Sequence, residues 1–173
     1  LERQGRENAY LDLVRASAEA IASSRSLDRW IEAEEPGAPR IEKLRLFFNH
    51  PLFLQAVSEH AEAALGDLGD PHRDAVRVLF TAHSIPLAQA ACSPYVEQLE
   101  EAARLVAEAL DTPTWDLVYQ SRSGPPHQAW LEPDVCDRLR QLHDAGQEQP
   151  ILLVPLGFLS DHMEVLYDLD IRA

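Results

Sequence analysis

Cysteine, basic residues and long apolar runs are all scarce in this chain, and each scarcity excludes a class of protein. The two cysteines, Cys92 and Cys136, are too few for a disulfide scaffold or an all-cysteine metal site, and they favour a reducing, cytoplasm-like compartment. No eighteen apolar residues run together, and residues 1–10 have no apolar core of a signal peptide. The sequence therefore predicts a soluble domain and leaves peripheral membrane contact open.

Basic residues are outnumbered, with 15 lysines and arginines against 29 acidic residues and a formal net charge of -14. A phosphate-coated partner would be repelled unless basic residues clustered locally. Arg138 and Arg140 come nearest to a cluster, but they share a predicted helix with Asp134 and Asp137. The sequence also has no G-x-G-x-x-G, Walker, G-x-S-x-G or H-E-x-x-H motif. We expect no nucleic-acid partner, and acid–base or metal-transfer chemistry remains.

The 173 residues, 46% of them apolar, suffice for one sizeable core. Apolar positions in Asn8–Ser23 follow a helical stripe, and Glu34–Arg40 is rich in turn residues. We therefore divide the chain into residues 1–36, an amphipathic helix and loop, and residues 37–173, the main domain.

Short apolar runs alternate with longer helical periods in the main domain. Strands are predicted at Leu44–Phe48, Val76–Ala82, Trp115–Gln120 and Ile151–Pro155. Helices are predicted at Pro51–Leu65, at Pro94–Leu110 with Ser93 as N-cap, at Glu132–Asp144 and from near Ser160 onward. This alternation is typical of an α/β fold, a parallel sheet between two helical layers, with ligand chemistry where the strands end.

Three strands run directly into loops that carry reactive side chains. The first loop contains His83, the second contains Ser121 and Arg122, and the third leads into a helix from Ser160 to Asp168. Because the carboxyl ends of parallel strands meet at one edge, we expect these residues to surround one crevice. Arg122 could bind an anion there, although a glycine-permitted turn at Gly124 explains that loop equally well.

His83 and Glu164 are the main candidates for chemistry at this edge. A strand-end imidazole can simply hydrogen-bond to backbone, but a neutral one can also accept a proton or bind a metal near physiological pH. Glu164 and Asp168 are four residues apart, on nearly one helix face with Ser160 a turn earlier. In a cleft, such carboxylates can relay protons or a divalent cation; otherwise they form a solvated acidic face.

Five segments carry the most recognisable motifs, and in order and spacing they resemble the ferrochelatase family. They are Phe47–Pro51, Leu79–Pro86, Gln120–Pro126, Trp130–Val135 and Pro155–Asp168, within a similarity from about Pro39 to Ile171. The resemblance implies a chelatase-like fold, one of the two Rossmann-like domains of ferrochelatase, in its carboxyl-terminal half. We expect the first domain, which would form the opposite wall of the cleft, to be absent from this chain.

The resemblance also implies insertion of ferrous iron into protoporphyrin IX or coproporphyrin III, in heme biosynthesis and in a bacterial-type cytoplasm. It matches His83 to the cleft histidine proposed as proton acceptor or iron ligand, and Glu164 and Asp168 to acidic residues that conduct protons or metal. Ser121, Arg122 and Ser160 would then line the porphyrin cleft.

Two departures from the family and two other functions remain to be weighed. Arg172 stands where many members carry another acid, and two cysteines cannot supply the four ligands of the [2Fe–2S] cluster that some members hold, so no cofactor beyond substrate Fe²⁺ is expected. The alternatives are a non-catalytic tetrapyrrole- or heme-binding domain and a chelatase for another tetrapyrrole, such as sirohydrochlorin.

Overall fold

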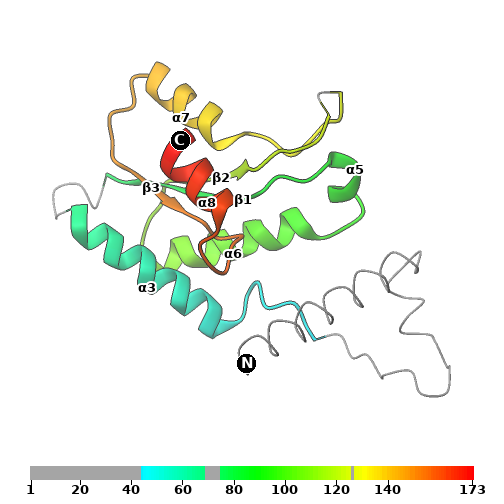
Figure 1. Cartoon of the computed structure of the whole chain (residues 1–173). Helices are drawn as coiled ribbons and strands as arrows, with labels where there is room; N and C mark the ends of the chain where they lie inside the picture. The colour runs from blue at the N-terminus through cyan, green and yellow to red at the C-terminus, as the bar shows by residue number, and fades with distance from the viewer. Residues whose placement is uncertain (1–43, 69–74, 126) are drawn as a thin grey trace, which may run out of the picture. The chain divides into compact units, whose positions relative to one another are not determined.

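The structure is a computed structural model that describes residues 44–68, 75–125 and 127–173 (Figure 1). The chain divides into two units, Leu1–Leu46 and Phe47–Ala173. The predicted helix at Asn8–Ser23 and the predicted boundary between residues 36 and 37 lie outside the described residues. The following account concerns the second unit, which contains every described helix and strand.

Three parallel strands form the sheet: β1 (Arg77–His83), β2 (Trp115–Gln120) and β3 (Ile151–Val154), in the order β2-β1-β3. Residues 78–82 of the central strand β1 are completely buried, as expected for a strand with neighbours at both edges and helices on both faces. His83 is in register with Gln120, and Phe80 with Val154. Three of the four predicted strands are thus confirmed to within a residue at each end.

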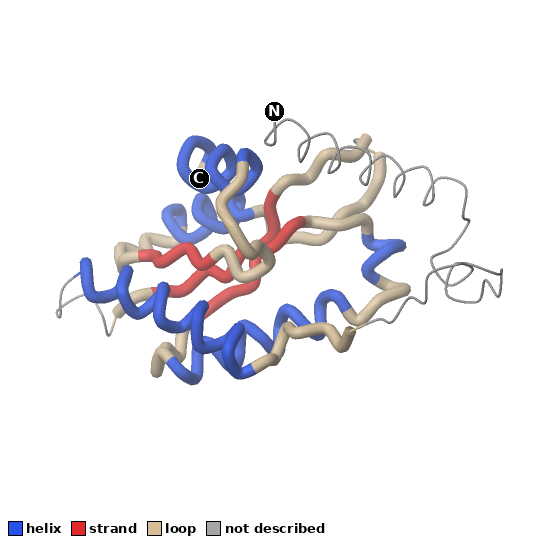
Figure 2. Tube along the Cα trace, turned by 60° about the horizontal axis from the view of Figure 1, so that its bottom comes forward, coloured by secondary structure: helices blue, strands red, loops and turns tan. Residues whose placement is uncertain are grey.

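Helices cover both faces of the sheet (Figure 2). Val78 and Phe80 of β1 belong to the core formed with α3 (Pro51–Leu68) and α6 (Tyr95–Ala109). Leu79, which points the other way because strand side chains alternate, belongs to the core formed with α7 (Val135–Asp144). The α/β three-layer fold predicted from the alternating pattern is confirmed.

The fourth predicted strand, Leu44–Phe48, is wrong, because residues 44–47 have no regular structure and residues 48–49 form a turn. Apolar alternation yields a strand only where a neighbouring edge accepts its hydrogen bonds. This segment instead leads into α3. His50 Nδ1 accepts the Leu52 amide at 3.2 Å, and the Phe47 ring lies edge-on to Phe53 at 5.5 Å.

Two helices begin later than predicted. Helix α6 begins at Tyr95 with Pro94 as its N-cap, and the Ser93 hydroxyl donates back to the Gln89 carbonyl at 3.3 Å instead of capping α6. Helix α7 begins at Val135, where the Asp134 side chain accepts the Cys136 amide at 2.9 Å. A short helix, α5 (Leu87–Ala90), was not predicted.

The last helical segment also begins later, at Met163 rather than near Ser160. His162 precedes it with an extended backbone, φ −153° and ψ 174°, which is incompatible with a helix through that residue. The segment comprises α8 (Met163–Val165) and η1 (Leu166–Arg172), a π-helix with i→i+5 hydrogen bonds. Ser160 therefore lies in the loop after β3, not on the helix face of Glu164 and Asp168.

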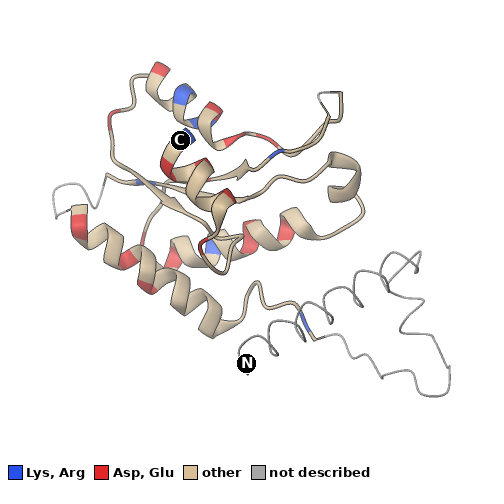
Figure 3. Ribbon diagram, viewed as in Figure 1, with Lys and Arg blue, Asp and Glu red and all other residues tan. Residues whose placement is uncertain are grey.

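Charge is distributed over the outer faces of the helices (Figure 3). Acidic side chains lie on α3, α6, α7 and the C-terminal segment, and the arginines of the described part of the chain are spread over strands, helices and loops, with two of them, Arg138 and Arg140, on α7. Within the described residues, no helix is long and apolar enough to cross a membrane.

Candidate active site

The loops that follow the three strands meet at one edge of the sheet. Gly157, in the loop after β3, donates its amide to the Thr81 carbonyl of β1 at 3.0 Å. A Cβ atom on Gly157 would lie 2.8 Å from Ala82 Cβ, so glycine permits this close approach. The loop after β3 is thereby fixed against β1, and it leads into α8 beside His83.

His83 ends the central strand, and its carbonyl accepts the Tyr95 hydroxyl of α6 at 3.0 Å. Its Nδ1 lies 2.5 Å from the Ser84 carbonyl oxygen. Because a carbonyl can only accept, this contact assigns the hydrogen of the neutral ring to Nδ1 and leaves the lone pair on Nε2. His83 therefore presents a base or metal-ligand atom to the edge of the sheet.

That Nε2 atom lies 3.8 Å from Glu164 Oε2 of α8. The side chains are 34% and 57% exposed, and an ion pair with this exposure contributes only about 0–1 kcal/mol to stability. The distance is too long for a direct hydrogen bond. The pair is therefore a weak structural contact between a ring nitrogen and a carboxylate oxygen.

Asp168 reaches the same edge at the end of β2, but it is buried, with 7% of its side chain exposed. Its Oδ2 accepts the Ser121 hydroxyl at 2.5 Å, and its Oδ1 accepts Arg172 Nη1 at 2.9 Å. The hydrogen bond to Asp168 raises the pKa of the Arg172 guanidinium further above its usual value. Both Asp168 oxygens thus have protein partners, unlike the open Glu164 carboxylate.

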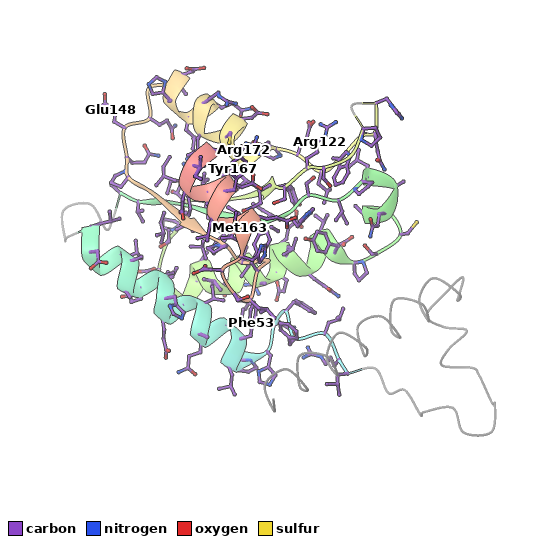
Figure 4. The ribbon with its side chains drawn as sticks, in the orientation of Figure 1. Phe53, Arg122, Glu148, Met163, Tyr167 and Arg172 are labelled. Atoms are coloured by element: carbon purple, nitrogen blue, oxygen red, sulfur yellow. The ribbon has the colours of Figure 1, made fainter. Side chains whose placement is uncertain are left out.

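Ser160 and Arg122 lie in two other grooves. Ser160 lines a groove of about 450 Å³ with α3 and β3, whose lining residues include Phe158 but not His83 or Glu164. Arg122 lies on the loop after β2, donates to the Gln128 carbonyl at 3.1 Å and lines a groove of about 410 Å³ with Trp130 (Figure 4). The structure brings His83 to Glu164 and Ser121 to Asp168, but it does not gather all six predicted residues in one pocket.

Three residues of this edge were missed by sequence reasoning. Arg172 could have been found, because an opposite charge four residues after Asp168 is a common helical pair. Tyr95, whose hydroxyl fixes the end of β1, gave no sequence signal. Nor did Gln120, which is fully buried and has no hydrogen-bond partner for its amide among the described residues.

The described residues contain no group of three or more histidine, cysteine, aspartate or glutamate side chains that could hold an ion. His83 and Glu164 are thus a pair of neighbouring side chains of these types, not members of a larger group among the described residues.

Comparison with known proteins gives one consistent result. The sequence model of the ferrochelatase family, described as "Ferrochelatase", matches residues 3–173. A ferrochelatase of Rhodopirellula baltica is 51% identical over 138 residues, which are 79% of this chain and 39% of the relative. Coproporphyrin III ferrochelatases of Nocardia farcinica and Streptomyces griseus are 44% and 41% identical, over 85% and 99% of this chain and 44% and 45% of theirs.

The chain spans less than half the length of these curated relatives. The match nevertheless covers nearly all of its residues, including the three strand ends and the C-terminal helical segment. The family resemblance inferred from the five sequence motifs is therefore confirmed, and this chain belongs to the ferrochelatase family.

Proposed function

We propose that the protein inserts ferrous iron into a porphyrin in heme biosynthesis, and that this chain supplies the half of the site formed by His83 and Glu164. The observation that carries the proposal is the 3.8 Å approach of His83 Nε2 to Glu164 Oε2. Typical N–metal and O–metal distances for a divalent ion such as zinc sum to about 4.2 Å. The two atoms can therefore hold one cation between them without moving apart.

The chemistry of metal insertion requires both a base and a cation site. Two pyrrole N–H protons must leave the neutral porphyrin as one Fe²⁺ enters, so the product is a neutral metal complex and the two positive charges leave as protons. A neutral imidazole near physiological pH can accept a proton, and the neighbouring carboxylate can accept it in turn or hold the incoming cation. His83 is proposed as the base and iron ligand, and Glu164 as the metal-facing carboxylate.

The roles expected of the other predicted residues stay predictions. Asp168 is predicted to relay protons or metal, and Ser121, Arg122 and Ser160 to line the porphyrin cleft; the grooves around Arg122 and Ser160 are distinct from the His83–Glu164 pair. We propose that the remaining part of a ferrochelatase, a first domain, supplies the opposite wall, because the relatives are more than twice as long. A cytoplasmic location, with contact to a membrane surface left open, is proposed with it.

The substrate porphyrin is proposed to be coproporphyrin III or protoporphyrin IX. Two of the relatives described above are coproporphyrin III ferrochelatases, which favours the first. No cofactor beyond the substrate iron is proposed for this chain, because its two cysteines are too few for an iron–sulfur cluster, and Cys92 is exposed whereas Cys136, on α7, is buried in the core.

The experiment is anaerobic insertion of Fe²⁺, or of Zn²⁺ as a probe, into both porphyrins by the full-length protein, followed by absorbance. His83→Ala should lower the insertion rate about 100-fold or more, as expected for loss of a general base. His143→Ala is the matched control, because that histidine also lies beside a carboxylate, Asp144 at 3.3 Å, but is fully solvent-exposed on α7.

Normal turnover by the His83→Ala variant would overturn the proposed role of His83. Porphyrin binding without insertion by the unmodified protein would instead favour the non-catalytic tetrapyrrole-binding alternative. Metal insertion into sirohydrochlorin, and into neither porphyrin, would favour the other alternative, a chelatase for another tetrapyrrole.

A further inference from the structure

The buried carboxylate of Asp168 is unusually well compensated for a residue so near the surface. Ser121 and Arg172 each occupy one of its oxygens, at 2.5 and 2.9 Å. A buried charge is costly unless it is paired and hydrogen-bonded, so the three side chains act as one unit. We call Ser121, Asp168 and Arg172 the Asp168 cluster.

The Asp168 cluster joins three parts of the fold. Ser121 follows β2 directly and has φ +62°, a left-handed conformation that is unfavourable for a residue other than glycine. Its bond to Asp168 helps to hold that conformation. The Arg172 carbonyl accepts the Cys136 thiol of α7 at 3.6 Å, so the cluster connects the end of β2, helix α7 and η1.

Apolar packing holds the C-terminal helical segment only weakly. Val165 is its one fully buried apolar residue and Leu169 packs, partly buried, against the core beside α7, whereas Met163, Leu166, Tyr167 and Ile171 are exposed. Met163 and Tyr167 are labelled in Figure 4. An element with so little buried apolar surface has low local stability and depends on its remaining contacts. The Asp168 cluster is the most buried polar contact of this segment, which carries Glu164 one turn earlier.

We propose that Asp168 is a positioning residue: paired with Arg172 and Ser121, it fixes the segment of residues 163–173 so that Glu164 stays opposite His83 Nε2. The inference deepens the proposed function and rests on it. It differs from the relay role expected for Asp168, because a relay must exchange protons, whereas a positioning carboxylate has only to keep its hydrogen bonds to Ser121 and Arg172. Arg172 is then as necessary as Asp168.

The test compares Arg172→Gln and Arg172→Lys with Arg140→Gln in the full-length protein. Arg140 is the matched control, because it pairs with Asp137 on α7 at 2.7 Å but is largely exposed. The first readout is hydrogen exchange of the amides of residues 163–173, without metal or porphyrin. Arg172→Gln should raise these exchange rates about tenfold, from loss of one charge-assisted hydrogen bond, while Arg172→Lys restores most of the protection and Arg140→Gln has no effect.

The second readout is Zn²⁺ insertion as a function of metal concentration. Arg172→Gln should raise the KM for the metal at least fivefold and leave porphyrin binding unchanged, because Glu164 is displaced while the sheet stays intact. Wild-type exchange rates in Arg172→Gln would overturn the inference, and a shift in the pH profile with unchanged exchange would favour the relay role. Because exchange requires neither substrate, failure of insertion by the unmodified protein would overturn only the proposed function.

Discussion

Asp116 of β2 joins the neighbouring strand β1 and helix α7 at the edge of the sheet opposite His83. From β2 it accepts Arg77 Nη1 of β1 at 2.7 Å and Arg138 Nη2 of α7 at 3.0 and 3.2 Å. The three side chains are only 15–25% exposed, so solvent screens these contacts incompletely. Removing the carboxylate would leave two partly buried guanidinium groups without this partner.

The expected cost of Asp116→Ala lies between the values for exposed and buried ion pairs. Loss of an exposed pair costs about 0–1 kcal/mol and that of a buried one about 3–5 kcal/mol, so we expect the free energy of unfolding to fall by about 2–3 kcal/mol. Asp137→Ala is the control, because Asp137 also pairs with an arginine of α7, Arg140, at 2.7 Å, but both side chains are more than half exposed. It should cost about 0.5 kcal/mol or less.

Urea denaturation followed by circular dichroism measures both changes. With a slope of about 2 kcal/mol per molar urea, Asp116→Ala should lower the unfolding midpoint by about 1 M, and Asp137→Ala by no more than about 0.25 M. Equal losses in the two variants, or a loss below about 0.5 kcal/mol for Asp116→Ala, would refute the argument that partial burial determines the strength of this network.

Three further predictions concern single side chains of the sheet and its loops. Gly157→Ala should lower the free energy of unfolding by about 1–3 kcal/mol in the same assay, because the new Cβ would lie 2.8 and 2.9 Å from Ala82 Cβ and Cα; an unchanged midpoint would contradict this. Gln120→Met should leave stability unchanged or raise it by up to about 1 kcal/mol, because its buried amide has no partner among the described residues; a clear loss would show that the amide is bonded. Burial, aided by Glu100 and Tyr95, raises the pKa of Tyr119 to about 12 from 10.0, so its stabilising contribution is complete below pH 10 and lost as pH rises to 12; Tyr119→Phe should lose less stability over that range, and an equal loss would count against the shift.

Residue patterns were sufficient to predict a helix or strand where a single local rule determines it. Largely apolar runs such as Val76–Ala82 became buried strands, because such a run is stable only when both faces are covered. The strand predicted at Leu44–Phe48 was wrong, because apolar alternation in a sequence does not show whether a neighbouring strand edge is there to pair with it. The predicted start of the last helix, near Ser160, was wrong for a similar reason, because the extended backbone of His162 is set by the loop around it.

The sequence by itself determined the family and the convergence of His83, Ser121 and the C-terminal segment, because parallel strands bring their carboxyl ends to one edge. Only the tertiary structure decided which carboxylate stays open. In the sequence, Glu164 and Asp168 are two acidic residues four positions apart in one helical segment, and the pattern does not distinguish them. A serine 47 positions away and an arginine four positions away occupy the oxygens of Asp168, whereas the Glu164 side chain is 57% exposed and its Oε2 lies 3.8 Å from His83 Nε2. Burial and pairing are properties of the contacts between distant segments, and these distinguish the two acids.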